Sequence, residues 1–260
     1  MPISIEGKKI LITGGARGIG GDSTRYLAAE GANIVTFDVR DELGIQLAEE
    51  ATEAGPGSVT YRHVDVSNLD EIKAGVDFAA EHLGGLDAVF NIAGVAPHSA
   101  AEAIPEADWD SVLAINVKGL AYVCAAAFQH MKDTGGSIVN FAADAALMDG
   151  PIHSAAYSAS KGAVISYTRT IGKEWAGYKI RANCVNPVVM TPIVEEARSV
   201  LSPEEREQYA KEIEQSIPLG GQFGDVEEDL APVLLFLASD ASKFMTSGIF
   251  CVNGGLAYVR

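Results

Sequence analysis

Residues 9–20 read KILITGGARGIG and join a short apolar segment to a glycine-rich loop. The apolar run at 9–13 predicts a buried strand, and the residue spacing after it predicts a helix over 19–29. Glycine lets a backbone approach a pyrophosphate closely, and a helix N-terminus offers unpaired N–H groups. A tight turn packed on a sheet would also use glycines, but the position between strand and helix favours a dinucleotide-binding loop. Its candidate residues are Gly14, Arg17, Gly18, Ile19 and Gly20.

Short β-branched runs alternate with longer amphipathic stretches along the rest of the chain. We expect strands at 9–13, 33–38, 58–64, 86–92, 137–142, 181–186 and 249–252. We expect helices at 19–29, 42–53, 69–83, 106–131, 155–176, 203–216 and 225–237. This alternation is typical of an α/β fold with a mostly parallel sheet. The sequence therefore predicts a single Rossmann-type domain over 1–260, a doubly wound sheet of about seven parallel strands flanked by helices on both faces.

The segment 193–215 differs from this pattern, because it is rich in Glu and Arg and carries no strand signal. It fits two interpretations equally well, a helical excursion over a cleft or a solvated helix. Within the domain we expect 188–217 to form a substrate loop or lid.

The composition excludes several classes of protein. The chain of 260 residues carries a net charge of −16, whereas binding to a phosphate backbone needs a basic surface. No run of about 18 apolar residues marks a membrane span, and no apolar segment with a cleavage site marks a signal peptide. The three cysteines are scattered among apolar neighbours, as is typical of buried thiols in a reducing compartment. We expect a cytoplasmic protein with no nucleic-acid, membrane or metal partner.

The expected second strand ends in a carboxylate, Asp38, 18 residues after Gly20. A carboxylate there accepts hydrogen bonds from an adenosine ribose diol and repels a 2′-phosphate, which favours NAD over NADP. The alternative is an ordinary aspartate that caps the next helix, and Arg40 weakens the preference for NAD. At the end of the third strand, Asp65 and Val66 lie where a carboxylate would meet the adenine amino group, or where a helix N-cap would stand.

Tyr157 and Lys161 are four residues apart in an expected helix, so their side chains lie on one face. A tyrosine with its ordinary pKa of about 10 is a poor base. A neighbouring ammonium favours the phenolate and brings the tyrosine pKa toward the working pH, as general acid–base catalysis requires. A helix tyrosine beside a surface lysine is also a common pair, but the glycine loop favours the catalytic interpretation.

Several motifs occur in an order that resembles the short-chain dehydrogenases/reductases. The resemblance covers the whole chain and rests on motifs that are specific jointly, namely Thr13-Gly14-x-x-x-Gly18-x-Gly20, Asn91-Ile92-Ala93-Gly94, Asn116, Tyr157-Ser158-Ala159-Ser160-Lys161, Asn186-Pro187…Thr191-Pro192 and Val252-Asn253-Gly254-Gly255. It implies an NAD-dependent alcohol dehydrogenase or ketone reductase. It also implies a homotetramer that packs partly through the helices at 106–131 and 155–176.

The resemblance implies further roles for the catalytic residues. Lys161 would hydrogen-bond the nicotinamide ribose in addition to tuning Tyr157. Asn116 would interrupt its helix with a bound water and complete a proton relay through the lysine. The alternative for Asn116 is an exposed helix asparagine.

The same resemblance places other residues beside the cofactor. Asn91, Ala93 and Gly94 would lie where the fourth strand meets it, although Asn91 also suits a purely sheet-stabilising role. Pro187 and Thr191 would lie near the nicotinamide. The loop that joins these last two residues lacks the usual glycine and is one residue shorter than the family pattern.

One family residue is missing from the catalytic set. The family places a serine at the end of the fifth strand, and its hydroxyl donates to the substrate oxygen. The strand pattern puts Ala143 at this position, whereas counting 13 residues back from Tyr157 gives Asp144. Three explanations follow: a serine-to-alanine variant with reduced activity, a chain that recruits another donor (Ser154, His153 or a protonated Asp144), or a weakly active natural relative.

The leading hypothesis is reversible hydride transfer between NAD and a secondary alcohol or ketone, with Tyr157 as acid and base. The expected pocket is mostly apolar, which suggests an alicyclic or aromatic substrate; its residues are Val95, Pro97, Asp144, Met148, His153, Val188 and Met190. The alternative from another class is a nucleotide-binding regulatory or scaffolding protein that has lost turnover.

Overall fold

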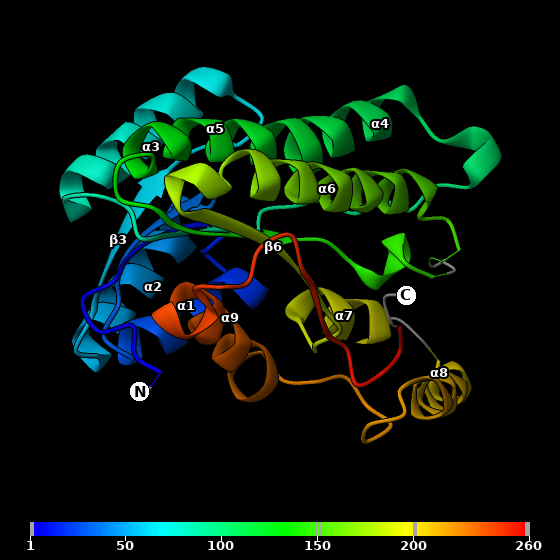
Figure 1. Cartoon of the computed structure of the whole chain (residues 1–260). Helices are drawn as coiled ribbons and strands as arrows, with labels where there is room; N and C mark the ends of the chain where they lie inside the picture. Colours follow the sequence, from blue (N-terminus) through cyan, green and yellow to red (C-terminus); the bar gives the residue numbers. More distant parts are fainter. Residues whose placement is uncertain (1–2, 149, 151, 200–201, 258–260) are drawn as a thin grey trace.

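Seven strands form one parallel sheet among the residues that the computed structural model describes, which are 3–148, 150, 152–199 and 202–257 (Figure 1). In chain order they are β1 (Lys9–Thr13), β2 (Asn33–Asp38), β3 (Ser58–His63), β4 (Ala88–Asn91), β5 (Gly136–Phe141), β6 (Ile180–Pro187) and β7 (Ile249–Val252). Their order across the sheet is β3-β2-β1-β4-β5-β6-β7. The chain therefore winds outward from β1 on one side and from β4 on the other, and the predicted doubly wound fold is confirmed.

Helices cover both faces of the sheet (Figure 1). One face carries α3 (Leu69–Leu83), α4 (Glu106–Val112), α5 (Leu120–Met131) and α6 (Ala155–Glu174). The other face carries α1 (Gly18–Ala29), α2 (Asp41–Ala54) and α9 (Ala231–Ala238), while α7 (Pro192–Ser199) and α8 (Pro203–Ser216) follow β6 beyond its carboxyl end. Short 3-10 turns lie at η1 (Ala101–Ala103), η3 (Asp144–Ala146), η4 (Ala176–Tyr178) and η6 (Asp240–Ser242).

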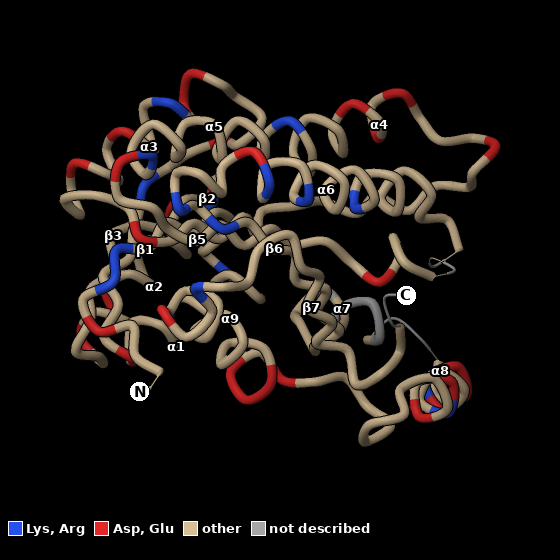
Figure 2. Tube along the Cα trace, in the orientation of Figure 1, with Lys and Arg blue, Asp and Glu red and all other residues tan. Residues whose placement is uncertain are grey.

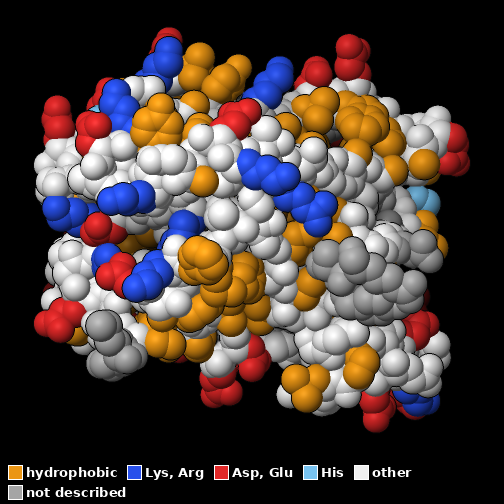
Figure 3. Space-filling model, in the orientation of Figure 1, with side chains coloured by type: hydrophobic (Ala, Val, Ile, Leu, Met, Phe, Trp, Pro, Cys, Tyr) orange, Lys and Arg blue, Asp and Glu red, His pale blue; other side chains and the backbone are white. Residues whose placement is uncertain are grey.

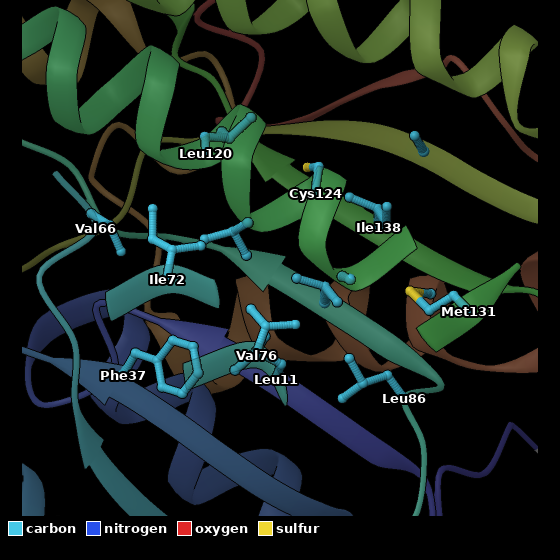
Figure 4. Packing of buried hydrophobic residues seen from close by; sticks show 14 of the residues in the cluster. Leu11, Phe37, Val66, Ile72, Val76, Leu86, Leu120, Cys124, Met131 and Ile138 are labelled. Carbon is cyan, nitrogen blue, oxygen red and sulfur yellow. The ribbon is translucent and has the colours of Figure 1, made fainter. Parts of the chain in front are cut away.

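The hydrophobic core is divided by the sheet into two clusters, one under α3, α5 and α6 and the other under α1, α2 and α9. In Figure 4, Leu11 and Phe37 from the sheet lie beside Ile72 and Val76 from α3. All four side chains are fully buried. Because both faces of a parallel sheet are covered, its strands consist of nearly continuous apolar runs, which is why the sequence locates them well.

The predicted element ends agree closely with the structure. Helix α3 has the predicted bounds because both of its ends carry strong signals. The Asn68 side chain accepts hydrogen bonds from the first N–H groups of the helix, and Gly84 ends it in the left-handed conformation with a φ of 71°. The ends of β3, β4, β5 and β6 differ from their predicted positions by one or two residues.

Two predicted helices contain wider π-helical turns. The helix expected at 106–131 consists of α4, a π segment η2 (Leu113–Gly119) and α5. The helix expected at 225–237 begins as a π segment η5 (Val226–Leu230) before α9. Pro232, in the first turn of α9, has no N–H to donate along the helix, which disfavours a regular α-turn there. The first π segment has no such signal, and π turns are frequent at functional sites.

Helix α8 resolves part of the segment whose form the sequence leaves open. Its N-terminus has a capping box between Ser202 and Glu205, with Pro203 in the first turn, and none of its residues is buried. Helix α8 is therefore exposed to solvent, and a substrate loop or lid over 188–217 stays a prediction. Residues 200–201 of the predicted lid lie outside the described residues.

Helix α7, in contrast, begins beside the glycine loop. Pro192 Cδ lies 3.8 Å from the place that a Cβ on Gly18 would occupy. Gly18 and Ile19 are the first residues of α1, so the segment after β6 starts close to the expected cofactor loop.

The continuous helix Glu106–Met131 is long and apolar enough to cross a membrane by length and composition alone, with a mean hydropathy of 1.6 over 18 residues. Its second half, α5, packs along α3 over the sheet (Figure 1). Val123, Cys124, Ala127 and Met131 are fully buried in that packing. Core packing therefore accounts for the apolar character of α5, the second half of this helix.

Candidate active site

The glycine loop joins β1 to α1 and leaves little room for side chains. Gly14 has a φ of 71°, and a Cβ there would lie 2.8 Å from the backbone N and Cα of Ala93. A Cβ on Gly20 would overlap the carbonyl oxygen of Gly14. Arg17, the N-cap of α1, makes no side-chain capping bond, and the first turn holds no acidic residue. The first N–H groups of α1 are therefore suited to an anion such as a pyrophosphate.

Asp38 ends β2 and lies against the glycine loop. Its Oδ2 accepts a hydrogen bond of 3.1 Å from the N–H of Ala16. Its Oδ1 accepts hydrogen bonds from the N–H groups of Val39 and Arg40, at 2.8 Å and 3.1 Å. Helix α2 begins at Asp41 with Arg40 as its N-cap, so the alternative that Asp38 caps this helix is wrong. The carboxylate is fixed beside the loop, as a contact with an adenosine ribose requires.

Asp65 and Val66 follow β3 in different environments. The Asp65 Oδ1 accepts a hydrogen bond of 2.8 Å from the N–H of Ser67, and the N-cap of α3 is Asn68. The alternative that Asp65 is the N-cap is therefore wrong. The Val66 side chain is buried in the core cluster under α3 and α5, and contacts of Asp65 and Val66 with the cofactor stay predictions.

The end of β4 is held by a residue of β1. The Thr13 Oγ1 accepts hydrogen bonds of 3.2 Å from the N–H groups of both Ile92 and Ala93. Asn91 is buried, and its Nδ2 donates a hydrogen bond of 2.8 Å to the Asn140 Oδ1 on β5. The Asn91 side chain therefore stabilises the sheet, and the predicted contact with the cofactor does not come from this side chain.

Asn116 lies in the π segment and ties the helix to the loop after β4. It is only 1% exposed, so the alternative of an exposed helix asparagine is wrong. Its Oδ1 accepts a hydrogen bond of 2.8 Å from the Val95 N–H, and its Nδ2 donates to the Val95 carbonyl and to the Ser160 Oγ. A Cβ on Gly94 would lie 3.2 Å from the Asn116 Oδ1 and 3.7 Å from the Lys161 Nζ. The glycine therefore keeps the space between the amide and the ammonium open.

Tyr157 and Lys161 lie on one face of α6, as predicted, with 5.6 Å between the lysine Nζ and the tyrosine ring centroid. The buried ammonium donates a hydrogen bond of 2.7 Å to the Phe141 carbonyl oxygen at the end of β5. Burial lowers the pKa of Lys161 to about 8 and raises the pKa of Tyr157 to about 12. The shift is therefore opposite to the predicted direction in the protein alone, and its cause is the loss of hydration on burial.

Ala143 stands half-buried just after β5, and its neighbours offer little to replace a hydroxyl. The carboxyl of Asp144 is buried, and its Oδ2 accepts a hydrogen bond of 2.6 Å from the Asn253 Nδ2. Burial raises the pKa of Asp144. His153 is exposed and has a φ of 65°, whereas Ser154 is buried at the start of α6. One oxygen of Asp144 is thus bound to Asn253, while its Oδ1 is buried with no hydrogen-bond partner among the described residues.

The predicted pocket residues fall into separate groups. Pro97 and His153 line one small pocket, together with Ser99, Ile104, Asp108 and Ala156. Val188 and Met190 follow β6, while Met148 is 42% exposed after η3. Neither these three residues nor Val95 line the pocket of Pro97, so a substrate pocket shared by all of them stays a prediction.

The short loop after β6 is anchored at its centre. Val189 forms a parallel bridge with Gly224, between Pro187 at the end of β6 and Thr191 before α7. The Thr191 Oγ1 accepts a hydrogen bond of 3.4 Å from the Val194 N–H and so helps to start α7. Contacts of Pro187 and Thr191 with a nicotinamide stay predictions.

Sequence reasoning missed two polar residues that hold the site together, Thr13 and Ser160. The Ser160 Oγ is buried, donates to the Tyr157 carbonyl oxygen at 2.7 Å and accepts from the Asn116 Nδ2 at 3.0 Å. Both residues lie inside the quoted motifs: Thr13 directly precedes Gly14, and Ser160 directly precedes Lys161. Their position next to candidate site residues was the signal that could have identified them. Within the described ranges, no three His, Cys, Asp or Glu side chains group as metal ligands would.

Comparison with known proteins extends over nearly the whole chain. Residues 14–257 match the protein family described as enoyl-(acyl carrier protein) reductase. A 3-oxoacyl-(acyl-carrier-protein) reductase of Chlamydia pneumoniae is 35% identical over 259 residues, which are 99% of this chain and 100% of the relative. A trans-4-hydroxycyclohexanecarboxylate dehydrogenase of Sinomonas cyclohexanicum is 34% identical over 255 residues, 95% of this chain and 92% of the relative. The crystal structure of levodione reductase is similar with a TM-score of 0.88 and 30% identity, over 96% of this chain and 97% of that one.

Proposed function

This chain belongs to the short-chain dehydrogenases/reductases, and we propose that it transfers a hydride between NAD(H) and a secondary alcohol or ketone. Membership makes it an oxidoreductase of a family that uses a nicotinamide cofactor. The observation that carries the finer proposal is the pairing of Tyr157 and Lys161 on α6, beside the space that Gly94 leaves next to Asn116. A hydroxyl, an ammonium and an amide thus gather at the carboxyl end of the sheet, where α/β folds bind their ligands.

The cofactor is proposed to be NAD because of Asp38. When bound, NAD supplies the hydride acceptor of alcohol oxidation. The chain would hold its pyrophosphate at the N-terminus of α1 and its adenosine ribose at the Asp38 carboxylate, which the Ala16 N–H fixes beside the loop. A carboxylate at this place repels the 2′-phosphate of NADP, whereas the exposed Arg40 two residues away weakens that discrimination.

Tyr157 is proposed as the acid and base. In ketone reduction a neutral phenol gives its proton to the substrate oxygen, and burial keeps Tyr157 in this form. In alcohol oxidation Tyr157 takes the hydroxyl proton, for which the phenolate must be stabilised. Lys161 is the cation placed to do so. The space at Gly94, between the Lys161 Nζ and the Asn116 Oδ1, suits a water that passes protons onward from the lysine.

Activity is proposed to be reduced because Ala143 stands at the serine position. The loss of one donor aimed at the reacting oxygen typically costs about 10²–10³ in rate. Among the three explanations, the serine-to-alanine variant is favoured, because the remainder of the catalytic set is present and Asp144 already uses one carboxyl oxygen to bind Asn253. The alternative of a regulatory or scaffolding protein that has lost turnover receives no support from the comparisons, whose named relatives are enzymes.

The substrate is proposed to be a neutral alicyclic or aromatic molecule. The names of two similar proteins, a hydroxycyclohexanecarboxylate dehydrogenase and levodione reductase, support a ring. The first name also contains an anionic carboxylate, so the neutral charge is argued from this chain alone. The charge of the protein supports a neutral substrate. Residues 92–117, which follow β4, hold four acidic residues and no Lys or Arg. Helix α8 adds five acidic and two basic residues, and Figure 2 shows acidic residues along α4 and α8. A negative surface of this kind disfavours anionic substrates.

A homotetramer in the cytoplasm is proposed for the assembled enzyme. The continuous helix at 106–131 exposes two large apolar side chains, Leu113 at 38% and Tyr122 at 42%. Figure 3 shows apolar side chains gathered on the surface near α9. Phe244, which follows η6 in the chain, is fully exposed. Exposed apolar patches of this kind mark contacts between subunits.

A turnover assay tests the proposal. Neutral cyclic and aromatic secondary alcohols, and the matching ketones, are offered with NAD⁺ or NADH to the unaltered chain and to the Tyr157→Phe variant. We expect slow turnover by the first and none by the second. Tyr167→Phe, which removes another hydroxyl from the same helix, is the matched control and should stay active. If neither the chain nor its Ala143→Ser variant turns over any substrate while NAD still binds, the enzyme proposal fails and the scaffolding alternative gains.

A further inference from the structure

The segment of residues 188–222, here named the substrate segment, is attached at both ends to the carboxyl end of β7. Near its start, the Val188 N–H donates a hydrogen bond of 2.8 Å to the Val252 carbonyl oxygen. Near its end, the Leu219 N–H donates one of 2.8 Å to the Gly254 carbonyl oxygen. In Figure 1 the red chain of β7 and the turn after it lie beside α7. The position of α7 and α8 therefore depends on residues 252–254 together with the bridge between Val189 and Gly224.

Asn253 stands between the two attachment points and is only 5% exposed. Its Oδ1 accepts a hydrogen bond of 3.0 Å from the Gly255 N–H, and its Nδ2 donates one of 2.8 Å to the Ala257 carbonyl oxygen. The second hydrogen of Nδ2 is donated to the Asp144 Oδ2 at 2.6 Å. Two of the three bonds are therefore local to the turn after β7, and the bond to Asp144 is the one that reaches another element.

Asp144 brings this connection to the catalytic side of the molecule. It is the residue after Ala143 and lies in η3, just beyond the β5 carbonyl that binds the Lys161 ammonium. Asp144 is only 6% exposed. Burying a carboxyl group costs free energy unless the group is hydrogen-bonded. The bond to Asn253 joins positions 109 residues apart in the chain, so local folding of η3 does not require it.

We propose that Asp144 is a positioning residue for the substrate segment: through Asn253 it fixes the carboxyl end of β7, and with it residues 188 and 219, relative to Ala143. The inference rests on the proposed function only in that the substrate segment borders the bound substrate. Tyr157 and Lys161 are positioned by α6 and β5 and do not depend on this bond. The glycine loop and Asp38 lie on β1, α1 and β2, and the substrate segment approaches them at Pro192, its residue beside Gly18. The effect therefore falls on substrate binding.

The kinetic test compares Asp144→Ala with Asp144→Asn. Loss of one buried hydrogen bond corresponds to a change of about tenfold, so Asp144→Ala should raise the substrate KM by about this factor and leave kcat nearly unchanged. Asp144→Asn should keep the KM, because its amide oxygen accepts the same bond from Asn253. Asp110→Ala removes an exposed acidic charge from α4 and is the matched control. The Kd of ADP-ribose, which lacks the nicotinamide, should be equal in all four proteins.

Hydrogen exchange gives a readout that does not need turnover. In Asp144→Ala the amides of Val188 and Leu219 should exchange faster, whereas amides of β1 should not change. Asn253→Ala removes the bond from its other end, together with the local bonds to Gly255 and Ala257, and covers a failure of Asp144→Ala to fold. The double variant should show no increase in KM beyond that of Asn253→Ala. Unchanged exchange and KM in both single variants would overturn the proposal, and so would an Asp144→Asn protein as impaired as Asp144→Ala. Faster exchange in a chain without any turnover would refute the proposed function and retain the positioning role.

Discussion

The Lys161 ammonium donates a 2.7 Å hydrogen bond to the Phe141 carbonyl oxygen, two residues before Ala143. This bond joins the catalytic helix α6 to the end of β5. Lys161 is therefore bound to the same strand end that carries Ala143, the residue at the family's serine position. The lysine is buried, and burial lowers its pKa from 10.5 to about 8. The charged form of Lys161 is therefore less favourable in the folded protein than in water.

The stability of the protein should reveal this buried cation. Between pH 8 and pH 10.5 the unfolded chain keeps the Lys161 proton and the folded protein releases it, so the contribution to the free energy of unfolding rises with pH. A shift of this size corresponds to about 3 kcal/mol. Urea unfolding on both sides of pH 8 should show the rise in the unaltered chain and lose it in Lys161→Met. Lys173→Met, an exposed lysine of the same helix, should keep it; identical pH profiles for all three proteins would contradict the burial argument.

Tyr157 should ionise only at high pH in the protein without cofactor. Burial raises its pKa to about 12, so the tyrosinate absorbance lost in Tyr157→Phe should develop well above pH 10. Saturation with NAD⁺ places a positive charge near the phenol and should move the midpoint downward. The rate of alcohol oxidation should accordingly rise with pH, since oxidation needs the phenolate. A midpoint at or below pH 10 without cofactor would show that Lys161 already dominates burial.

The fold and the catalytic pair could be predicted because they depend on local order. Strands buried on both faces consist of continuous runs of apolar residues, as in β1. A spacing of four residues places Tyr157 and Lys161 on one helix face. The π segment around Asn116 was missed because the apolar spacing of a helix does not record whether its bonds run to the fourth or the fifth residue.

Long-range pairs and burial could not be predicted from the sequence. Asp144 and Asn253 are 109 residues apart, and neither residue type indicates that the two side chains form a hydrogen bond. The direction of the Tyr157 pKa shift was predicted wrongly for the same reason, because the sequence supplies the nearby charge but not the amount of water that folding removes. Asn91 faces Asn140 rather than the cofactor, and only the register of β4 against β5 reveals it.

Asp38→Ala should weaken NAD binding by about 10- to 100-fold, since hydrogen bonds to a charged acceptor contribute about 1.5–3 kcal/mol. The affinity for NADP should not rise above that for NAD, because the variant gains no group that binds the 2′-phosphate. Fluorescence titration of both cofactors measures the two constants. Glu42→Gln, which changes an exposed acid in the first turn of α2, is the control and should bind NAD normally. Unchanged NAD affinity in Asp38→Ala would refute the ribose role.

Asn116→Ala should destabilise the protein by about 2–3 kcal/mol, because it leaves buried polar groups unpaired. The Val95 N–H and carbonyl and the Ser160 hydroxyl all lose their Asn116 partner. Asn116→Asp keeps an acceptor for the Val95 N–H. At low pH its neutral carboxyl donates only one hydrogen, where the Asn116 amide donates to both the Val95 carbonyl and the Ser160 hydroxyl, so its loss should be intermediate there. Urea unfolding measures both changes. A loss below about 0.5 kcal/mol in Asn116→Ala, within the range of ordinary surface substitutions, would mean that the amide does not hold this loop.

Ala143→Ser should raise kcat by about 10²–10³, because it restores a donor aimed at the oxygen on which charge develops. The Kd for NAD should not change, since the glycine loop and Asp38 lie on other strands. Ala145→Ser adds the same hydroxyl two residues further along η3 and should leave kcat unchanged, which separates position from composition. Steady-state kinetics on one cyclic alcohol are sufficient for the comparison. If Ala143→Ser gains no more than Ala145→Ser, position 143 does not face the reacting oxygen, and the alignment of β5 that placed the missing serine there is wrong.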